Sequence, residues 1–465
     1  MADTRAHPFM PNSAPALHAA LLAELGLETA EPLFGQIPEN HRFNGDLAQP
    51  PALAEEVLLA RHLRTTLARN VTADDNLSFL GGGIWQHHVP AVVDEIVNRA
   101  EFLTPVWGTP SSDFGRNQAW FEFTSQLGAL LDLELVGLPV YSWGCAAGHA
   151  FRMAARLTGR RRILLPARLC PERRAVIAAY CASADPAAAI TLVDVPCDHL
   201  GRLDLAALAA LLDTETAAVY YENPAYFGGF ETGAAEIARL ARAAGAETIA
   251  GINPISLGVI APPGVLGVDI AVGTIQPLGI HMAAGGGLGG FIASRDEACY
   301  AAQYPTLLNS LATTVAGEMA FGLMLFHQSS YGSRDEGNDW TGNSTYLWAI
   351  AATTYMALLG PTGFRELGEL LLVRTRDAAL ALASVPGVTV IGGAARFVDL
   401  IVDFNATGRS VADINNALLD HGIFGGLDLS GAFPDLGQSA LYAVTEVHDT
   451  DDIARLAAAL AEVLA

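Results

Sequence analysis

The stretch of sequence that decides the fold covers residues 251–279 and reads GINPISLGVIAPPGVLGVDIAVGTIQPLG. It connects two short apolar segments, at 248–252 and 268–272, through a loop rich in glycine and proline. Apolar segments of this length, bounded by turn residues, are typical of strands buried on both faces of a parallel sheet. The stretch therefore predicts two buried strands joined by a turn-rich connection.

The same kind of pattern extends outward over residues 118–295. Short apolar segments predict further strands, and segments with helical periodicity predict helices between them. The strands are expected at 162–165, 189–193, 217–221 and 290–293, and the helices at 119–131, 145–157, 172–182, 205–212 and 234–244. This alternation predicts a mainly parallel sheet, and ligands of such sheets gather at the carboxyl ends of the strands.

We expect three parts in the chain. Residues 1–77 form an N-terminal arm with one helix at about 53–68, because six prolines interrupt the first 50 residues. Residues 78–330 form the large domain, and residues 331–465 form a small α/β domain. Residues 300–342 are expected to be irregular and mobile. In the small domain we expect helices at 346–359, 363–383, 411–421 and 451–464, and strands at 388–391, 397–402 and 440–444.

Composition excludes several classes of function. The net charge of −23 repels phosphate backbones, so nucleic acid is not an expected partner. Five widely spaced cysteines without a CxxC motif predict neither a disulfide framework nor a zinc site, and they fit a reducing cytoplasm. The sequence shows no signal-peptide pattern and no apolar segment of membrane-spanning length.

The chain also contains no lysine, since all 26 of its basic residues are arginine. Lysine is the side chain that forms a Schiff base with an aldehyde cofactor and then carries protons. Any cofactor chemistry of that kind therefore needs an amine from elsewhere.

A set of motifs, in order along nearly the whole chain, carries a family resemblance. They include SFLGGG at 78–83, HHVP at 87–90, RAEFLT at 99–104, ENP at 222–224 and NPISLGVIAPPG at 253–264. In these motifs the chain resembles the glycine-cleavage P-protein, and more narrowly its lysine-lacking N-terminal-half subunit. The resemblance implies fold type I of the pyridoxal-phosphate-dependent transferases, which is aspartate-aminotransferase-like, with a large mainly parallel sheet domain and a small C-terminal α/β domain.

The resemblance also implies a heteromer. A homologous, lysine-bearing partner subunit would hold pyridoxal phosphate (PLP), and a lipoyl carrier protein is a further possible partner. On this chain the position of the Schiff-base lysine falls on Pro277, and the preceding histidine falls on Gln276. No PLP is therefore expected to be covalently bound to this chain, and no residue of it is expected to be catalytic.

The remaining cofactor positions of the family imply a relict pocket. Asn253 stands where a carboxylate would pair with the pyridine nitrogen, and Cys170 stands where a histidine would face the ring. Gly144 and Cys145 lie in the segment that would seat the phosphate at a helix N-terminus. The bulky Trp143 could fill the space. More simply, Asn253 caps the end of a strand and Cys170 is a small buried hydrophobe.

Two histidine features need separate interpretations. His281, four residues after Pro277, could act as a base in a lysine-free variant, although a hydrogen-bonded loop histidine is the simpler interpretation. The adjacent His87 and His88 point to opposite sides of an extended segment, so they cannot share one metal ion. No metal site is expected.

Three functions stay open at this point. The preferred one is a non-catalytic subunit of a glycine decarboxylase-like heteromer, which completes and stabilises the active site of the lysine-bearing partner. The second is a lysine-independent enzyme for a glycine-like amino acid, and the third is a scaffold that binds a small anion. The segments 105–116 and 300–342 depart from the family pattern and would fit a specialised paralogue.

Overall fold

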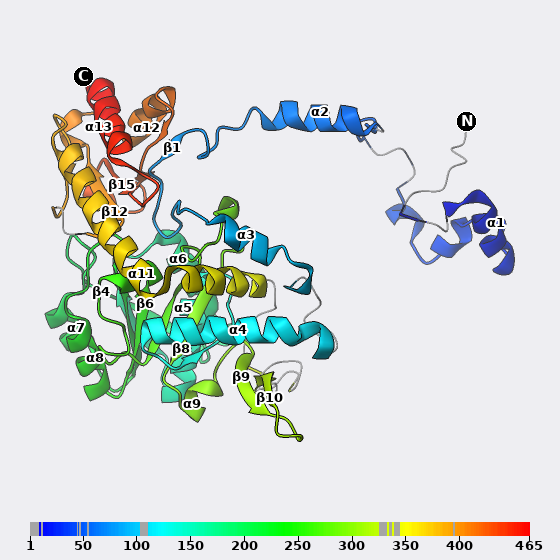
Figure 1. Cartoon of the computed structure of the whole chain (residues 1–465), viewed down its shortest axis with the longest axis horizontal. Coiled ribbons are helices and arrows are strands. Elements are labelled where there is room, and N and C mark those ends of the chain that lie inside the picture. Colours follow the sequence, from blue (N-terminus) through cyan, green and yellow to red (C-terminus); the bar gives the residue numbers. More distant parts are fainter. Residues whose placement is uncertain are drawn as a thin grey trace. The chain divides into compact units, whose positions relative to one another are not determined.

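A computed structural model gives the structure of this chain (Figure 1). The residues that it describes are 9–10, 13–43, 45, 48–53, 55–102, 110–324, 333, 337–338, 345–393 and 396–465, without the side chains of 110–115 and 323–324. The chain divides into two compact units, Met1–Asn70 and Val71–Ala465. None of the helices in the described part combines the length and apolar character that a membrane-spanning segment needs.

The first unit is helical. It holds α1 (Pro15–Glu24), α2 (Glu56–Leu67) and two short 3₁₀ turns, and none of these elements has a buried residue. The helix near residues 53–68 was expected, whereas α1 was not, because the prolines of the first 50 residues predict interruptions of helical structure. Pro15 occupies the first turn of α1, where its missing N–H costs nothing.

The second unit is built around a seven-stranded sheet. Its strand order is β2-β8-β7-β6-β5-β3-β4; β8 is antiparallel to β7 and to β2, and the other pairs are parallel. The mainly parallel sheet predicted from the sequence is therefore confirmed. The strands are β2 (Leu135–Val136), β3 (Arg162–Pro166), β4 (Thr191–Val195), β5 (Thr216–Asn223), β6 (Glu247–Ile252), β7 (Ile270–Thr274) and β8 (Gly290–Ser294).

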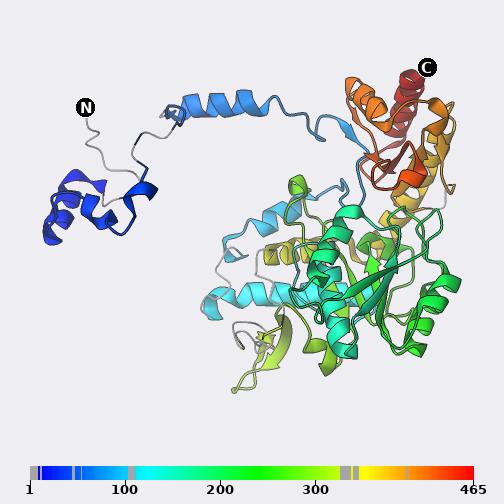
Figure 2. The same ribbon diagram turned by 180° about the vertical axis from the view of Figure 1, so that it is seen from behind.

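Helices cover the sheet, as the two opposite views show (Figures 1 and 2). They are α4 (Pro110–Leu131), α5 (Trp143–Thr158), α6 (Pro171–Cys181), α7 (Leu205–Leu211) and α8 (Ala234–Ala243), with α3 (Ala91–Val97) and α9 (Ala298–Ala301) further out. Every residue of β5 and β7 is buried. Burial on both faces is what an unbroken apolar strand pattern predicts.

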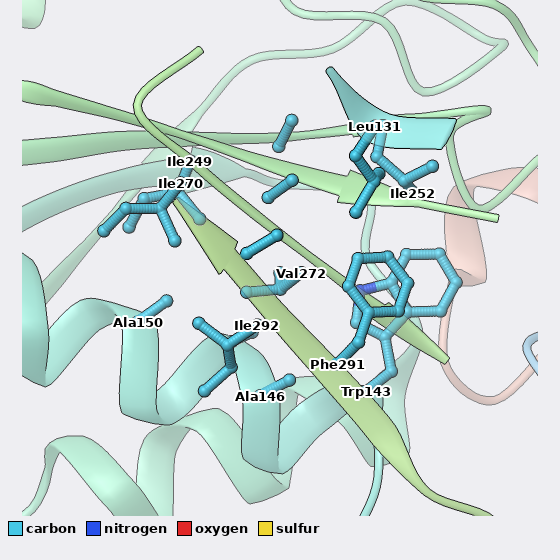
Figure 3. Packing of buried hydrophobic residues seen from close by; sticks show 14 of the residues in the cluster. Leu131, Trp143, Ala146, Ala150, Ile249, Ile252, Ile270, Val272, Phe291 and Ile292 are labelled. Carbon is cyan, nitrogen blue, oxygen red and sulfur yellow. The ribbon is translucent and has the colours of Figure 1, made fainter. Parts of the chain in front are cut away.

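The helix α5 lies directly on the sheet because its buried face is made of small residues. Ala146 and Ala150 of α5 face Val272 and Ile292 of the strands in the packed core (Figure 3). Ser142 caps the start of the helix, since its Oγ accepts a hydrogen bond from the Cys145 N–H at 3.2 Å. Gly159, with φ +69°, ends it in the left-handed conformation that favours glycine.

The small domain has a four-stranded antiparallel sheet with the order β11-β12-β15-β14. The elements are β11 (Thr389–Val390), β12 (Asp399–Asp403), β14 (Leu427–Asp428), β15 (Ser439–Ala443), α12 (Val411–Asp420) and α13 (Thr450–Leu464). A separate parallel pair joins β1 (Leu77–Ser78) to β13 (Ile423–Phe424). The N-terminal side of the large domain is thus attached to the small domain.

The long helix α11 (Tyr346–Ala383) is interrupted at Gly360, whose φ is +57°, and Pro361 follows. This break matches the two helices that the sequence predicts at 346–359 and 363–383. The expectation of irregular structure at 300–342 was wrong for its first part, where β9 (Leu308–Thr313) and β10 (Met319–Met324) form an antiparallel hairpin. Most of 325–342 lies outside the described residues. The boundaries proposed at residues 77 and 330 stay predictions.

Candidate functional site

The carboxyl ends of the parallel strands converge on one place. Glu222 lies near the end of β5, Asn253 directly follows β6, and Gln276 follows β7. This is where sheets of this type bind ligands. We call it the strand-end site, and its lining includes Gly83, Trp85, Trp143, Arg173, Glu222, Asn253 and Asp399. Its cavity volume is about 10 Å³, which is room for roughly one water molecule.

Two side chains fill the strand-end site. Trp143, the first residue of α5, is stacked against the guanidinium of Arg173 on α6, with 3.7 Å between Cζ and the ring centroid. The Trp143 Nε1–H donates to the Tyr220 hydroxyl at 3.2 Å. Gly251 on β6 makes room for the indole, because a Cβ there would lie 3.1 Å from Trp143 and 2.4 Å from the Tyr220 hydroxyl oxygen.

The charges in the site neutralise one another. Arg173 donates to Glu222 Oε1, and both residues are buried. Burial disfavours the charged guanidinium, but Glu222 outweighs it and raises the pKa of Arg173 above its usual range. Tyr220 donates to the same carboxylate oxygen at 2.7 Å, and burial together with Glu222 raises the pKa of Tyr220 well above its usual range. Arg173 and Glu222 therefore compensate each other, and neither charge is left over for a ligand.

A segment from the N-terminal side crosses the site and is fixed by Gln276. The Trp85 N–H donates to Gln276 Oε1 at 3.2 Å, and Gln276 Nε2 donates to the Trp85 carbonyl at 2.8 Å. Gln276 also donates to the Ile280 carbonyl at 3.3 Å. Gln276, at the family's histidine position, thus uses both its side-chain oxygen and its side-chain nitrogen in hydrogen bonds to the backbone.

The Trp85 indole reaches the small domain. Its Nε1–H donates to both carboxylate oxygens of Asp399 at 3.1 Å, and the Gly82 N–H donates to the same carboxylate at 3.3 Å. Burial raises the pKa of Asp399 to about 7, against the opposing effects of Trp85, Gly82, Arg173 and His87. Val398, just before it, has φ +63°, an uncommon backbone conformation for a β-branched residue.

The structure places the predicted relict-pocket residues as follows. Asn253 lines the strand-end site, but its Oδ1 accepts from the Ile255 N–H at 3.1 Å and starts the 3₁₀ turn Pro254–Gly258. Cys170 packs with Tyr226, and burial raises the pKa of its thiol, so it is a poor nucleophile. Gly144 and Cys145 form the first turn of α5.

Pro277 is buried directly beyond Gln276, whereas His281 lies elsewhere. The His281 side chain is 66% exposed, pairs with Asp94 at 3.0 Å, and does not line the strand-end site. His87 Nδ1 lies 2.8 Å from Glu446 Oε2, and the His88 N–H donates to Glu446 Oε1 at 2.7 Å. Within the described part of the chain, no group of histidine, cysteine and carboxylate side chains could hold a metal ion.

A wider outer pocket of about 380 Å³ adjoins the strand-end site. Glycines of two loops, at 81–83 and 285–289, line much of it, together with Trp143, Glu172 and Arg173. A phosphate there would face the carboxylate of Glu172, while Arg173 is already committed to Glu222. The deep end is closed and no amine is present, so these residues do not fit a PLP bound as an imine.

Sequence reasoning missed Trp85, Arg173 and Asp399 as parts of this site. A charged Glu222 at the end of an otherwise apolar strand was the one available signal for a buried cation nearby.

Comparisons with known proteins agree on one family. The family model described as glycine cleavage system P-protein matches residues 9–460. A protein of Staphylothermus marinus, called probable glycine dehydrogenase (decarboxylating) subunit 1, is 34% identical, and the match covers 98% of each chain. A protein of Thermococcus kodakarensis with the same name is also 34% identical over 98% of each chain.

Solved structures give the same result. The crystal structure of a glycine decarboxylase (P-protein) of the glycine cleavage system, in inhibitor-bound form, superposes with a TM-score of 0.87 at 30% identity, over 99% of this chain and 100% of that one. A sphingosine-1-phosphate lyase of Burkholderia pseudomallei, at 15% identity and a TM-score of 0.63, shares the fold over 92% of this chain and 94% of its own. The expected fold type I architecture is confirmed.

Proposed function

Because this chain belongs to the glycine cleavage system P-protein family, we propose that it is the non-catalytic subunit of a heteromeric, PLP-dependent glycine decarboxylase. A homologous, lysine-bearing subunit is its partner and holds the cofactor. This chain completes and stabilises the partner's active site. A lipoyl carrier protein is the third component of the proposal, and the complex works in the cytoplasm, where the five free cysteines stay reduced.

One observation carries the proposal: the strand-end site is closed by the chain's own side chains. Trp143, Arg173 and Glu222 leave about 10 Å³, whereas small-molecule sites usually measure some 300 Å³ or more. The sequence supplies no lysine with which an imine could form. Electron withdrawal by PLP, the chemistry that glycine decarboxylation needs, therefore belongs to the partner.

The first unit supports association with another chain. The helices α1 and α2 have no buried residue, although they carry Leu17, Leu21, Val57, Leu59 and Leu63. Exposed apolar side chains gathered on helices are typical of surfaces that a partner covers. Helices of this kind can bury apolar area against a partner.

The test is co-expression with a lysine-bearing homologous subunit. We expect the two chains to elute together in size-exclusion chromatography, and we expect release of carbon dioxide from glycine only from the mixture. The absorbance of a protein-bound PLP imine should appear with the partner and never with this chain alone. Turnover by the isolated chain, or a failure of the two chains to associate, would refute the proposal.

The lysine-independent enzyme is tested in the same assay by His281→Ala. The exposed position of His281, paired with Asp94, gives no reason to expect a base there. We therefore expect the complex with His281→Ala to keep its full rate. A rate lowered tenfold or more, with the complex intact, would favour the alternative.

A further inference from the structure

A separate hollow lies where α4, the 3₁₀ turn Pro254–Gly258 and the break in α11 meet. These three elements contact one another, and α4 and α11 lie side by side in both views (Figures 1 and 2). The volume of the hollow is about 480 Å³, within the usual size range of small-molecule sites. Its lining shares no residue with the strand-end site or the outer pocket. We call it the kink pocket, and its lining includes Gln126, Ala129, Leu257, Met356, Ala357 and Phe364.

The break in α11 opens the kink pocket. Gly360, with φ +57°, turns the chain out of the first half of the helix, and Pro361 begins the second half. A Cβ placed on Gly360 would meet no other atom within 4 Å, so the space beside it is open. Pro361 has no N–H, so the carbonyl of Ala357, four residues earlier, lacks its usual helical donor. The break therefore leaves an open space and a backbone acceptor at the same place.

Away from the break, the walls of the kink pocket are tightly packed. A Cβ on Gly258, at the end of the 3₁₀ turn, would clash with the carbonyl oxygen of Phe364 on α11. A Cβ on Gly368, one helical turn later, would lie 2.9 Å from Cγ1 of Val259. The second half of α11 is thus in close backbone contact with the turn. The pocket is preformed, so a ligand would not have to separate these elements to enter it.

One polar side chain lines the kink pocket without a partner. Gln126 belongs to α4, and its Oε1 is buried and accepts no hydrogen bond within the described part of the chain. A buried acceptor without a donor costs free energy, which a donor on a ligand would recover. None of the described lining residues is charged. An ion would lose its hydration there without gaining a counter-charge, so the lining selects against charged ligands.

We propose that the kink pocket binds a small, neutral aromatic compound with one N–H or O–H donor, of the indole or phenol class. The Gln126 Oε1 accepts from this donor, and the Ala357 carbonyl is a second acceptor nearby. The ring of the ligand packs against Met356 and Phe364, which are both buried. Aromatic rings and methionine sulfur attract another ring beyond the effect of area burial. This site is independent of the proposed subunit function.

The test uses the full chain and two probes of nearly the same shape, indole and benzofuran. Benzofuran lacks the N–H donor. Isothermal titration should show that indole binds at millimolar or lower concentration, and at least about threefold more tightly than benzofuran, because only indole can donate to Gln126. Indole should also raise Tm. Equal affinity for the two probes, or no binding of indole, would overturn the proposal.

A substitution at Gln126 tests the acceptor itself. Gln126→Leu removes the acceptor at nearly constant volume, so it should weaken indole binding by roughly 3- to 10-fold and leave benzofuran binding no weaker. The matched control is Gln118→Leu on the same helix, because Gln118 is exposed, donates to Glu122 and does not line the pocket. This control should bind both probes like the wild type. If the two leucine variants bind indole equally well, Gln126 takes no part and the proposal is wrong.

Filling the kink pocket tests the location. Ala129 is exposed on α4, so Ala129→Trp should fold normally, which circular dichroism and Tm without probe will verify. It should abolish the binding of both probes, and persistent binding would place them elsewhere and contradict the proposal. The competing occupant is an apolar side chain of another subunit. If Ala129→Trp blocks association with the lysine-bearing subunit while indole does not bind the wild type, the pocket is a subunit contact and the proposal fails.

Discussion

The two ends of α5 contrast sharply. At the amino end, where a helix dipole favours an anion, Trp143 and the mutually compensating Arg173–Glu222 pair fill the space. At the carboxyl end, where the dipole disfavours an anion, three arginines surround an open hollow. The contrast teaches that a place in the fold does not by itself decide whether a ligand can bind there. The side chains that fill that place or leave it open decide it.

The largest effect on stability should come from a substitution in the strand-end site, at the amino end of α5. Glu222→Ala leaves Arg173 buried without its counter-charge, and such a change costs about 3–5 kcal/mol of unfolding free energy. Urea unfolding followed by circular dichroism measures this cost. As a control, Glu236→Ala removes the acid of an exposed pair with Arg239 and should cost less than about 1 kcal/mol. Equal costs for the two variants would mean that the strand-end site is solvated.

A second effect depends on pH. The pKa of Asp399 is about 7 in the folded chain, above the usual 3.8, because of burial. As pH rises from about 4 through 7, the unfolded chain ionises Asp399 more readily than the folded chain does, so the folded state loses stability. The difference between the folded and unfolded pKa of Asp399 corresponds to a total loss of about 4 kcal/mol in the free energy of unfolding.

Asp399→Asn should remove this loss. Its oxygen can still accept from Trp85 or Gly82, so the variant should resemble the wild type at pH 4 and exceed it in stability by pH 8. Urea unfolding across this pH range gives the difference directly. A difference that does not change with pH would mean that Asp399 is not buried in a neutral form near pH 7.

A smaller effect should follow from releasing the segment that crosses the site. Gln276→Ala removes two hydrogen bonds to the Trp85 backbone and leaves those polar groups buried, at a cost of about 1–3 kcal/mol. Hydrogen exchange at the Trp85 amide should speed up in parallel. If exchange there is unchanged, Asp399 alone holds the segment.

The smallest effect on stability should come from a substitution near the carboxyl end of α5. Arg161→Gln removes one exposed charge and should change the unfolding free energy by no more than about 0.5 kcal/mol. Thermal unfolding at two ionic strengths measures this change. A destabilisation of about 2 kcal/mol would show that the arginine is a structural cap.

The sequence predicted the strands and helices of the large domain because each depends on local periodicity. It did not predict the β9–β10 hairpin, whose outer part exposes Leu311 and Met319 and so lacks the apolar pattern of a buried strand. It also missed α1, where a proline at the first helical turn resembles a breaker.

The closure of the site could be predicted only in part. The absence of lysine and the bulk of Trp143 are visible in the sequence. The contacts of Trp85 are not, because its partners Gln276 and Asp399 lie 191 and 314 residues away in the chain. Partners at such separations come together only through the three-dimensional arrangement of the two sheets.

Trp85 has a mechanical consequence. Its backbone is fastened beside the end of β7 in the seven-stranded sheet, and its indole is fastened to the first residue of β12 in the four-stranded sheet. A hinge movement that separated the two sheets would have to break one of these attachments. Trp85 therefore resists an opening between the seven-stranded and the four-stranded sheet.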